Sequence, residues 1–366
     1  MKPTPVLLMA RELNLGGTER QLTEIARSLD RVSFEPHVGC LREAGMRGEE
    51  LRAAGVPVVR FPADSFRSPS LISGIRKLGA YIREHGIEIV HTFDVPMNLF
   101  GVPVARMYRA PRVISSRRAH RDLAMGIRRP LLRLTDRIAD AVVVNCRSVR
   151  RELIEQERLD ERRIHLCYNG IDTTAFRPAS APRQGACLVI GVVCALRPEK
   201  DLGTLVRAFA EIRHVRPGLK LLIIGSGPER EPLEALARAS GLGDDFVLEP
   251  ATNRVAERLH CIDVFVLPSL SEALSNSLME AMACGCAVVA SRVGGNSELV
   301  SHGENGLLFE PGDARGLAAA LRQALEHDAQ RIRMASEAVR SIQTNFSLEV
   351  SAHRMAEIYR TVLEGA

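Results

Sequence analysis

Aromatic side chains are scarce in this chain of 366 residues, which has no tryptophan and only 4% aromatic residues in total. Proteins that bind single-stranded nucleic acid stack the bases on aromatic platforms. No such platform accompanies the basic segments, so nucleic-acid binding is the weakest interpretation of the chain's positive charge. Apolar runs of membrane-spanning length are also missing, and the apolar start at 1–10 is too short for a signal peptide. We therefore expect a cytoplasmic protein.

Two further absences limit the metal sites and disulfides that we expect in this chain. No two aspartates stand two residues apart, so the chain lacks the Asp-x-Asp clamp that holds a metal ion on a nucleoside diphosphate. We expect cationic side chains and helix ends to replace the metal, and we expect no cofactor. The eight cysteines are scattered, and the close pair Cys284 and Cys286 has a spacing that suits neither a disulfide nor a zinc site. Free, buried thiols are the prediction.

Positive charge is concentrated in one segment. The net charge of the chain is only +5, but residues 106–151 hold thirteen arginines and three aspartates. An excess of this size could attract a phosphate group or an anionic membrane surface. It could equally be a solvated face of the protein.

Short β-like runs alternate with helical patterns along the whole chain. The β-like runs lie at 6–9, 35–40, 56–61, 87–91, 112–115, 141–144, 187–193, 221–224, 246–248, 264–267 and 287–290. This alternation predicts an α/β protein with parallel, doubly wound sheets, and the length predicts two domains. A stretch rich in proline and small residues at 176–185 separates the two halves. We predict Rossmann-like domains at 1–178 and 179–345 that face a central cleft, and a helix at 346–366 that could pack back on the first domain.

Glycines and cations follow several of the predicted strands. Gly16 and Gly17 come after the first strand, and Gly225 begins a Gly-Ser-Gly turn. Each could bring the backbone close to an anion, although such turns are also common without a ligand and lack the three-glycine dinucleotide pattern. Arg197 and Lys200 stand three residues apart at another strand end, where two cations can bracket a diphosphate.

Two acids eight residues apart form the most informative pattern. Glu272 lies in a loop after an apolar strand, and Glu280 lies roughly one turn inside a helix that Ser275 or Ser277 can cap. The helix start between the two acids offers backbone N–H groups to an anion. The arrangement suits a ligand with a sugar at one end and a nucleoside at the other. The alternatives are an exposed loop acid for Glu272 and an ion pair on a helix face for Glu280.

Together these motifs resemble glycosyltransferase family 4, which comprises retaining, nucleotide-sugar-dependent enzymes of the GT-B fold. The matching segments are 16–20, 168–172, 197–200, 225–228, 271–280, 293–298, 303–308 and 311–313. The resemblance covers nearly the whole chain and is most specific from Arg197 to Asp313. It implies a UDP- or GDP-sugar donor held by the second domain and a glycan or lipid-linked acceptor held by the first. It also implies a role in cell-surface polysaccharide synthesis. The arginine excess at 106–151 and the helical pattern at 128–137 suggest separately that the first domain could dock on an anionic membrane to reach a lipid-linked acceptor.

The resemblance also implies roles for individual residues. Glu272 would hold hydroxyls of the donor sugar, and Glu280 would accept hydrogen bonds from the ribose. Arg197 and Lys200 would stabilise the departing diphosphate. The backbone near Asn276, Ser277 and Leu278 would share its charge, and Gly16, Gly17 and Gly225 would contact the donor.

The chain departs from the family pattern at the position of a catalytic histidine, among others. Where the family often has a histidine after a strand, this chain has Arg117 and Arg118, and His120 follows as the candidate catalytic histidine. His91, at another strand end, could also reach the cleft or be a structural residue. Three other functions remain open. The chain could be a phosphorylase of the same fold, a sugar-nucleotide epimerase, or a noncatalytic protein that binds a sugar nucleotide.

Overall fold

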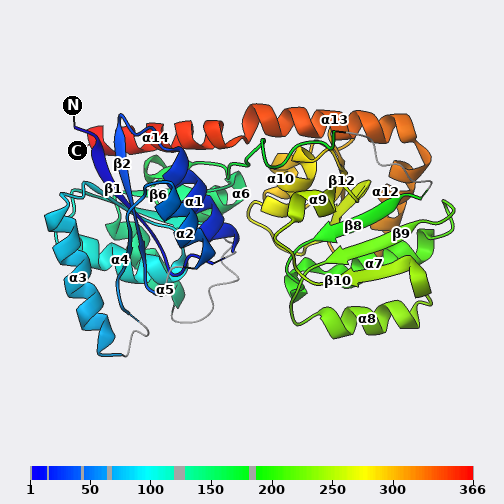
Figure 1. Ribbon diagram of the computed structural model, residues 1–366, viewed down its shortest axis with the longest axis horizontal. Coiled ribbons are helices and arrows are strands. Elements are labelled where there is room, and N and C mark those ends of the chain that lie inside the picture. The colour runs from blue at the N-terminus through cyan, green and yellow to red at the C-terminus, as the bar shows by residue number, and fades with distance from the viewer. Residues whose placement is uncertain are drawn as a thin grey trace. The chain divides into compact units, whose positions relative to one another are not determined.

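The computed structural model describes residues 2–14, 16–42, 45–63, 68–118, 128–180 and 187–365 (Figure 1). The chain forms two compact units: Met1–Gly170 with Leu348–Ala366, and Ile171–Ser347. The first unit ends at Gly170, whereas we expected a boundary at 178. The reason is that Gly170 exchanges two hydrogen bonds with Gln21 of the first unit, while the backbone N–H of Ile171 donates to Phe346 of the second.

The first unit contains a parallel sheet with the strand order β3-β2-β1-β4-β5-β6-β7. Its strands are β1 (Thr4–Ala10), β2 (Phe34–Cys40), β3 (Val58–Arg60), β4 (Ile89–Thr92), β5 (Arg112–Arg117), β6 (Ala141–Val144) and β7 (Ile164–Leu166). Its helices are α1 (Gly17–Ser28), α2 (Met46–Ala53), α3 (Ser70–Glu84), α4 (Val95–Met107), α5 (Arg128–Ile138), α6 (Arg147–Glu155), a 3-10 turn (Glu161–Arg163) and α14 (Leu348–Glu364).

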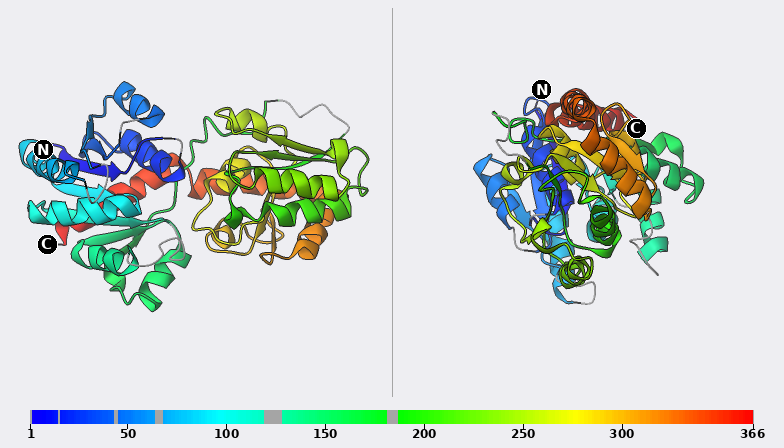
Figure 2. Two further views of the ribbon diagram at one scale, coloured as in Figure 1. Left: turned by 90° about the horizontal axis from the view of Figure 1, so that it is seen from below. Right: turned by 90° about the vertical axis from the view of Figure 1, so that its right-hand side faces the viewer.

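Strand β1 feeds hydrophobic cores on both faces of this sheet. Val6 and Leu8 pack in one cluster with residues of α1 and α14, and Leu7 and Met9 pack in another with residues of α3 and α4. Successive strand residues point to opposite faces, so a strand covered on both sides must be apolar throughout. Figure 2 shows helices on both sides of each sheet.

Helix α14 returns the end of the chain to the first unit. Met355 and Tyr359 are fully buried in the core that β1 and β2 share with α1. The ring of Tyr359 meets Phe34 edge-on, with 5.6 Å between ring centroids. The Arg112 side chain of β5 donates to the carbonyl of Val362 at 2.6 Å. The C-terminal helix is therefore part of the first unit's core, and Figure 1 shows it (red) beside β1 and β2.

The second unit contains a parallel sheet with the order β10-β9-β8-β11-β12-β13. Its strands are β8 (Val189–Val193), β9 (Lys220–Ile224), β10 (Phe246–Glu249), β11 (Val264–Leu267), β12 (Ala287–Ser291) and β13 (Leu307–Phe309). Its helices are α7 (Leu202–Ile212), α8 (Arg230–Ala239), α9 (Val255–Leu259), α10 (Asn276–Ala283), α11 (Asn296–Leu299), α12 (Ala314–Glu326) and α13 (Asp328–Asn345), with 3-10 turns at Pro198–Lys200 and Gly243–Asp245.

Both sheets have the topology of doubly wound folds, which confirms the predicted fold class. In the first sheet β1 lies between β2 and β4, and in the second β8 lies between β9 and β11. The strand order reverses at these positions, and ligands of such sheets bind at the carboxyl ends of the strands beside the reversal. All eight cysteines are free, as predicted, but Cys187, Cys194 and Cys261 are only partly buried. Among the helices in the described ranges, none has the length and apolarity needed to cross a bilayer.

Candidate functional site

The predicted donor residues gather at the reversal point of the second sheet. Arg197 and Lys200 follow β8, and Glu272 follows the neighbouring strand β11. Because parallel strands end at the same edge, two loops that are far apart in sequence meet there. The backbone N–H of Leu270 donates to the carbonyl of Glu199 at 2.8 Å and ties the two loops together.

Lys200 and Glu272 are paired with each other. The Lys200 ammonium donates to Oε1 of Glu272, and the Ser269 hydroxyl donates to the same oxygen at 2.9 Å. The side chains of Lys200 and Glu272 are only 17% and 12% exposed. The sequence predicted both residues for the site but neither their contact nor the part of Ser269. The pair holds a cation and a carboxylate in place at the carboxyl ends of β8 and β11.

Arg197 has a more open position. Its side chain is 64% exposed, and its charged neighbour is Glu199, with 3.8 Å between Nη1 and Oε1. The backbone of Arg197 is extended, and the 3-10 turn that follows ends at Asp201, whose φ of 45° is left-handed. This turn places Arg197 and Lys200 at the same strand end. Contact of both cations with one diphosphate stays a prediction.

The start of helix α10 is capped by Ser275, one of the two serines predicted for this role. Its hydroxyl accepts from the N–H of Leu278 at 3.4 Å and lies 3.1 Å from the hydroxyl of Ser277. Helix geometry directs the N–H groups of the first turn, including those of Asn276 and Ser277, out of the helix end. The loop that carries Glu272 therefore leads directly into an anion-attracting helix start.

Glu280 lies one turn inside α10 and is only 6% exposed. Burial, with a smaller effect from the charge of Glu280, raises the pKa of the Cys284 thiol to about 12. A carboxylate this deeply buried is not an acid on a solvated helix face. Contact with a ribose stays a prediction.

Gly225 has a packing role that the sequence did not reveal. A Cβ atom at this position would lie 1.9 Å from the carbonyl oxygen of Cys194, and one at Gly227 would lie 2.2 Å from that of Leu196. The backbone N–H of Leu196 donates to the carbonyl of Ser226 at 3.0 Å. The turn therefore packs against the segment that leads into Arg197, and donor contact by Gly225 stays a prediction.

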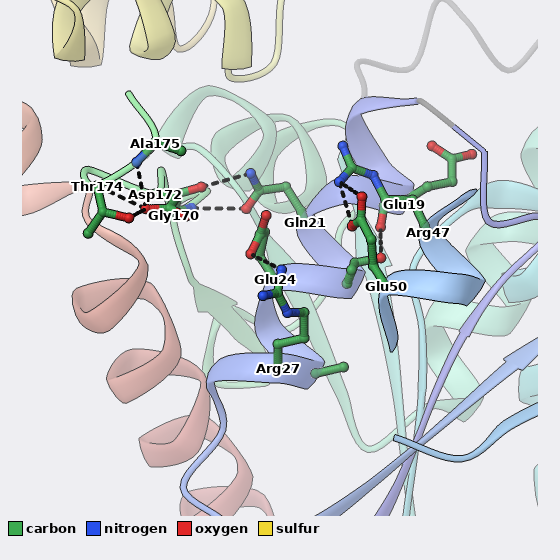
Figure 3. A network of polar contacts seen from close by, with 12 residues as sticks. Glu19, Gln21, Glu24, Arg27, Arg47, Glu50, Gly170, Asp172, Thr174 and Ala175 are labelled. Carbon is green, nitrogen blue, oxygen red and sulfur yellow. Dashed lines mark hydrogen bonds and ion pairs between the residues drawn. The ribbon is translucent and has the colours of Figure 1, made fainter. Parts of the chain in front are cut away.

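In the first unit, Gly16 immediately precedes helix α1 and Gly17 is its first residue. The Glu19 carboxylate folds back over this helix start, so that a Cβ at Gly16 would lie 2.0 Å from Oε2 of Glu19. Burial raises the pKa of Glu19. Figure 3 shows Glu19 beside Arg47 at this end of α1. A carboxylate of the chain itself thus lies at the helix start where we expect a donor phosphate.

The two candidate histidines have different outcomes. His120 lies outside the described residues. His91 is fully buried, with Nδ1 at 2.8 Å from the hydroxyl of Tyr359 and Nε2 at 2.8 Å from that of Ser116. Burial holds the pKa of His91 well below its usual value. These contacts are those of a structural histidine.

One residue at the reversal point of the first sheet escaped the prediction. Asp94 follows β4 and accepts hydrogen bonds from the backbone N–H groups of Arg11, at 2.6 Å, and Met97, at 2.8 Å. Its position before Val95-Pro96 is a helix-start signal that could have been recognised. Within the described ranges, no group of three His, Cys, Asp or Glu residues is placed to hold a metal ion.

Similarity to known families covers nearly the whole chain. Residues 15–175 match the family described as Glycosyltransferase Family 4, and residues 177–341 match Glycosyl transferases group 1. The chain is 28% identical over 329 residues to D-inositol 3-phosphate glycosyltransferase from Thermobispora bispora, a match that covers 81% of this chain and 75% of the relative. Five further matches to enzymes of that name cover 46% to 57% of the relatives' length.

A second relative and a solved structure are also glycosyltransferase-like in name or fold. The chain is 29% identical over 332 residues to a GDP-mannose-dependent alpha-(1-6)-phosphatidylinositol monomannoside mannosyltransferase from Mycobacterium tuberculosis, with 84% of each chain covered. HepE from Anabaena, solved in complex with UDP and glucose, matches with a TM-score of 0.86 at 20% identity over 97% of this chain and 99% of its own. At this identity the likeness shows the fold, which is GT-B.

Proposed function

Because the chain belongs to glycosyltransferase family 4 and is therefore a glycosyltransferase, we propose that it transfers a sugar from a nucleoside diphosphate donor to a glycan or lipid-linked acceptor, with retention of the anomeric configuration. The observation that carries this proposal is the joint placement of Arg197, Lys200 and Glu272 beside the start of α10. We assign the reaction to cell-surface polysaccharide synthesis at the cytoplasmic face of a membrane.

The proposed chemistry follows from the charges that develop in the reaction. The bond between the anomeric carbon and the β-phosphate oxygen breaks, which leaves positive charge on the sugar and negative charge on the diphosphate. Arg197, Lys200 and the α10 N–H groups stabilise the diphosphate as it leaves. The acceptor hydroxyl attacks from the same face and gives its proton to the departing phosphate. No protein nucleophile takes part.

We propose two different roles for the Lys200–Glu272 pair. Without donor, the carboxylate compensates the lysine charge at a site where both side chains are largely buried. With donor bound, Lys200 contacts the diphosphate and Glu272 accepts hydrogen bonds from the sugar hydroxyls. Glu280 accepts from the ribose, and no metal ion is required, so we expect turnover to persist in EDTA.

The nucleotide can be identified by a thermal-shift panel of nucleotides and nucleotide sugars. One relative is named for GDP-mannose, and HepE was solved with UDP, so UDP and GDP are the first probes. A ligand present at one hundred times its Kd stabilises the folded state by about 2.7 kcal/mol. We expect one of the two nucleotides to raise the melting temperature well above the other.

With the donor identified, Lys200→Ala and Glu272→Ala test the site. Loss of one preorganised charge-stabilising group costs about 10²- to 10³-fold in kcat, and we expect reductions of this size. The matched control is Lys220→Ala, because Lys220 lies in the same unit and pairs with Asp245 at the surface. Unchanged turnover in Glu272→Ala would show that the assignment is wrong.

A further inference from the structure

Strand β5 ends at Arg117, and Arg118 is the next residue. The two arginines differ in whether a carboxylate compensates their charge. Arg117 is buried and paired twice, with Nη1 at 2.7 Å from Asp136 and Nη2 at 3.2 Å from Glu157. Its positive charge is therefore compensated inside the first unit. Arg117 is a structural residue, and its neighbour Arg118 is not explained in this way.

Within the described ranges, Arg118 has one hydrogen-bond partner. Its Nη1 donates to Oδ1 of Asn169 at 2.8 Å, and its guanidinium lies over the ring of Phe93, 4.8 Å from the centroid. Its Nε–H is buried and has no hydrogen-bond partner within the part of the chain that the structure describes. A buried N–H group without an acceptor costs free energy, so folded proteins nearly always supply one.

The charge of Arg118 is also uncompensated. Among the described residues, no carboxylate forms an ion pair with it, and the titratable groups that act on its charge are Cys167 and Tyr359. Both are neutral at pH 7, since burial raises the pKa of each. Burial lowers the pKa of Arg118 to about 10, which leaves it protonated. The described residues of the first unit thus hold a positive charge for which none of them provides a counter-charge.

The partner that orients Arg118 is fixed in place. Asn169 is buried, and the next residue, Gly170, donates its N–H to Oε1 of Gln21 at 2.9 Å and accepts from Nε2 at 3.0 Å. Figure 3 shows this reciprocal pair between α1 and the turn. A guanidinium held from one side, with donors left over, is preorganised for a ligand.

A second unsatisfied group lies at the same edge of the sheet. The register pairs Arg117 with Val144, so Arg118 and Asn145 are the next residues at the carboxyl ends of adjacent strands β5 and β6. Asn145 is 3% exposed, and its Oδ1 has no hydrogen-bond partner in the described ranges. An amide oxygen needs a donor such as a hydroxyl group, whereas a guanidinium needs an oxyanion.

We propose that Arg118 binds a phosphate or carboxylate group of a hydroxylated ligand, and that Asn145 accepts a hydrogen bond from one of its hydroxyls. The ligand is then an acidic or phosphorylated sugar or polyol. Only its identification as the acceptor rests on the proposed function. The carboxyl edge of a doubly wound sheet is where such a ligand binds.

A surface cavity in the same unit is a weaker candidate. It has a volume of about 410 Å³ and is lined by α6, β7 and α14, with four arginines around it: Arg147, Arg150, Arg151 and Arg354. Two of them already have carboxylate partners, because Arg150 lies 2.7 Å from Glu161 and Arg354 lies 2.9 Å from Glu357. Arg118 has no carboxylate partner in the part of the chain that the structure describes.

The test measures anion binding to the full chain by thermal shift, in a background with Arg197→Ala and Lys200→Ala so that phosphate cannot bind the diphosphate cations. Inorganic phosphate and glucuronate are titrated separately at fixed ionic strength. We expect at least one to raise the melting temperature of the background protein, and Arg118→Gln to abolish the shift. Arg162→Gln removes an equal charge from an exposed site and should keep it. An equal shift in Arg118→Gln, or no shift in any variant, would overturn the proposal.

The same variants separate binding from a structural role. Without anion, Arg118→Gln should melt no lower than its parent, because it removes an uncompensated charge, whereas Arg117→Gln should melt lower because it leaves two buried carboxylates unpaired. Arg118→Lys keeps the charge without the planar fork and should show a reduced anion shift. A loss of stability in Arg118→Gln equal to that in Arg117→Gln would contradict the proposal. The anion shift needs no donor sugar, so it is read independently of turnover.

Discussion

At the scale of single residues, Asp94 combines a structural role with an unusual ionisation. It caps helix α4 and also holds the backbone N–H of Arg11, which follows β1. Burial raises its pKa to about 6, although the two N–H groups act in the opposite direction. The Asp94 carboxylate therefore connects the residue after β1 to the start of α4, although burial makes its charged form less favourable.

This ionisation predicts a pH dependence of stability. The pKa of Asp94 is higher in the folded chain than the ordinary aspartate value of 3.8, so the folded state binds the proton more tightly. Its contribution to the free energy of unfolding thus increases as the pH falls from above 6 towards 4. At 1.36 kcal/mol per pKa unit the change is at most about 3 kcal/mol. Urea titrations of the wild type and Asp94→Asn at several pH values measure it.

The variant is its own control, since asparagine also caps helices but does not titrate. The difference in unfolding free energy between the two proteins should move in favour of the wild type as the pH falls. A difference that stays constant between pH 7 and pH 4 would show that Asp94 ionises normally in the folded chain.

Predictions about single residues succeeded where the signal was local. The cap at Ser275 and the positions of Glu272 before α10 and Glu280 inside it follow from a few neighbouring residues. The contact between Lys200 and Glu272 joins residues 72 positions apart, so no local pattern could contain it. The same holds for Gly225, whose requirement for glycine comes from the backbone of Cys194.

At the scale of single elements, helix α5 has a face that the unit does not cover. Leu131 and Leu134 are 44% and 55% exposed, whereas Leu132 is buried. The thirteen arginines of 106–151 suggest a strongly basic surface, but several are neutralised locally; Arg106, for example, lies 2.6 Å from Asp140. What α5 offers is two exposed leucines on a helix with arginines, the composition of a helix that lies on a membrane surface.

We therefore propose that α5 contacts an anionic membrane when the acceptor is lipid-linked. Flotation with vesicles that contain phosphatidylserine should bring the protein to the lipid fraction, and neutral vesicles should do so less. Leu131→Gln together with Leu134→Gln should reduce the floated fraction, because the apolar contact is lost.

The matched control changes two exposed apolar residues elsewhere, Ile72→Gln and Val32→Gln, which are 57% and 82% exposed. These substitutions should leave flotation unchanged. Equal flotation with anionic and neutral vesicles would remove the membrane proposal.

At the scale of the whole molecule, each unit has its own sheet and core, and the last helix belongs to the first unit. Tyr359 of α14 connects this helix to β4 through its hydrogen bond with His91. Arg197, Lys200, Glu272 and Glu280, for which we propose contacts with the donor, lie in the second unit. A change in the α14 contact should therefore alter the stability of one unit and leave nucleotide binding by the other intact.

Tyr359→Phe tests this separation. It leaves a nitrogen of the buried His91 without its partner, which costs about 1–3 kcal/mol. We expect a lower free energy of unfolding for the first unit in urea, and unchanged affinity for UDP or GDP in a calorimetric titration.

Tyr108→Phe is the control, since the Tyr108 hydroxyl makes no hydrogen bond among the described residues, and it should change neither quantity. A weaker nucleotide affinity in Tyr359→Phe alone would show that the two units are coupled.

The general architecture was accessible from the sequence. The apolar runs predicted at 35–40, 112–115 and 141–144 became β2, β5 and β6 with nearly the same ends. The run predicted at 56–61 shortened to Val58–Arg60, because it is an outer strand that pairs on one side only. Strand ends depend on the neighbouring strand, which a local pattern does not contain.

The sequence by itself determined the alternation of strands and helices, the family, and the strand ends that carry Arg197, Glu272 and Arg118, because periodicity and motifs are properties of neighbouring residues. Only the tertiary structure decided which of those charges are compensated. It paired Lys200 with Glu272 and Arg117 with Asp136 and Glu157, and among the described residues it left Arg118 without a carboxylate. Compensation depends on distance in space, and parallel strands bring together side chains that are far apart along the chain.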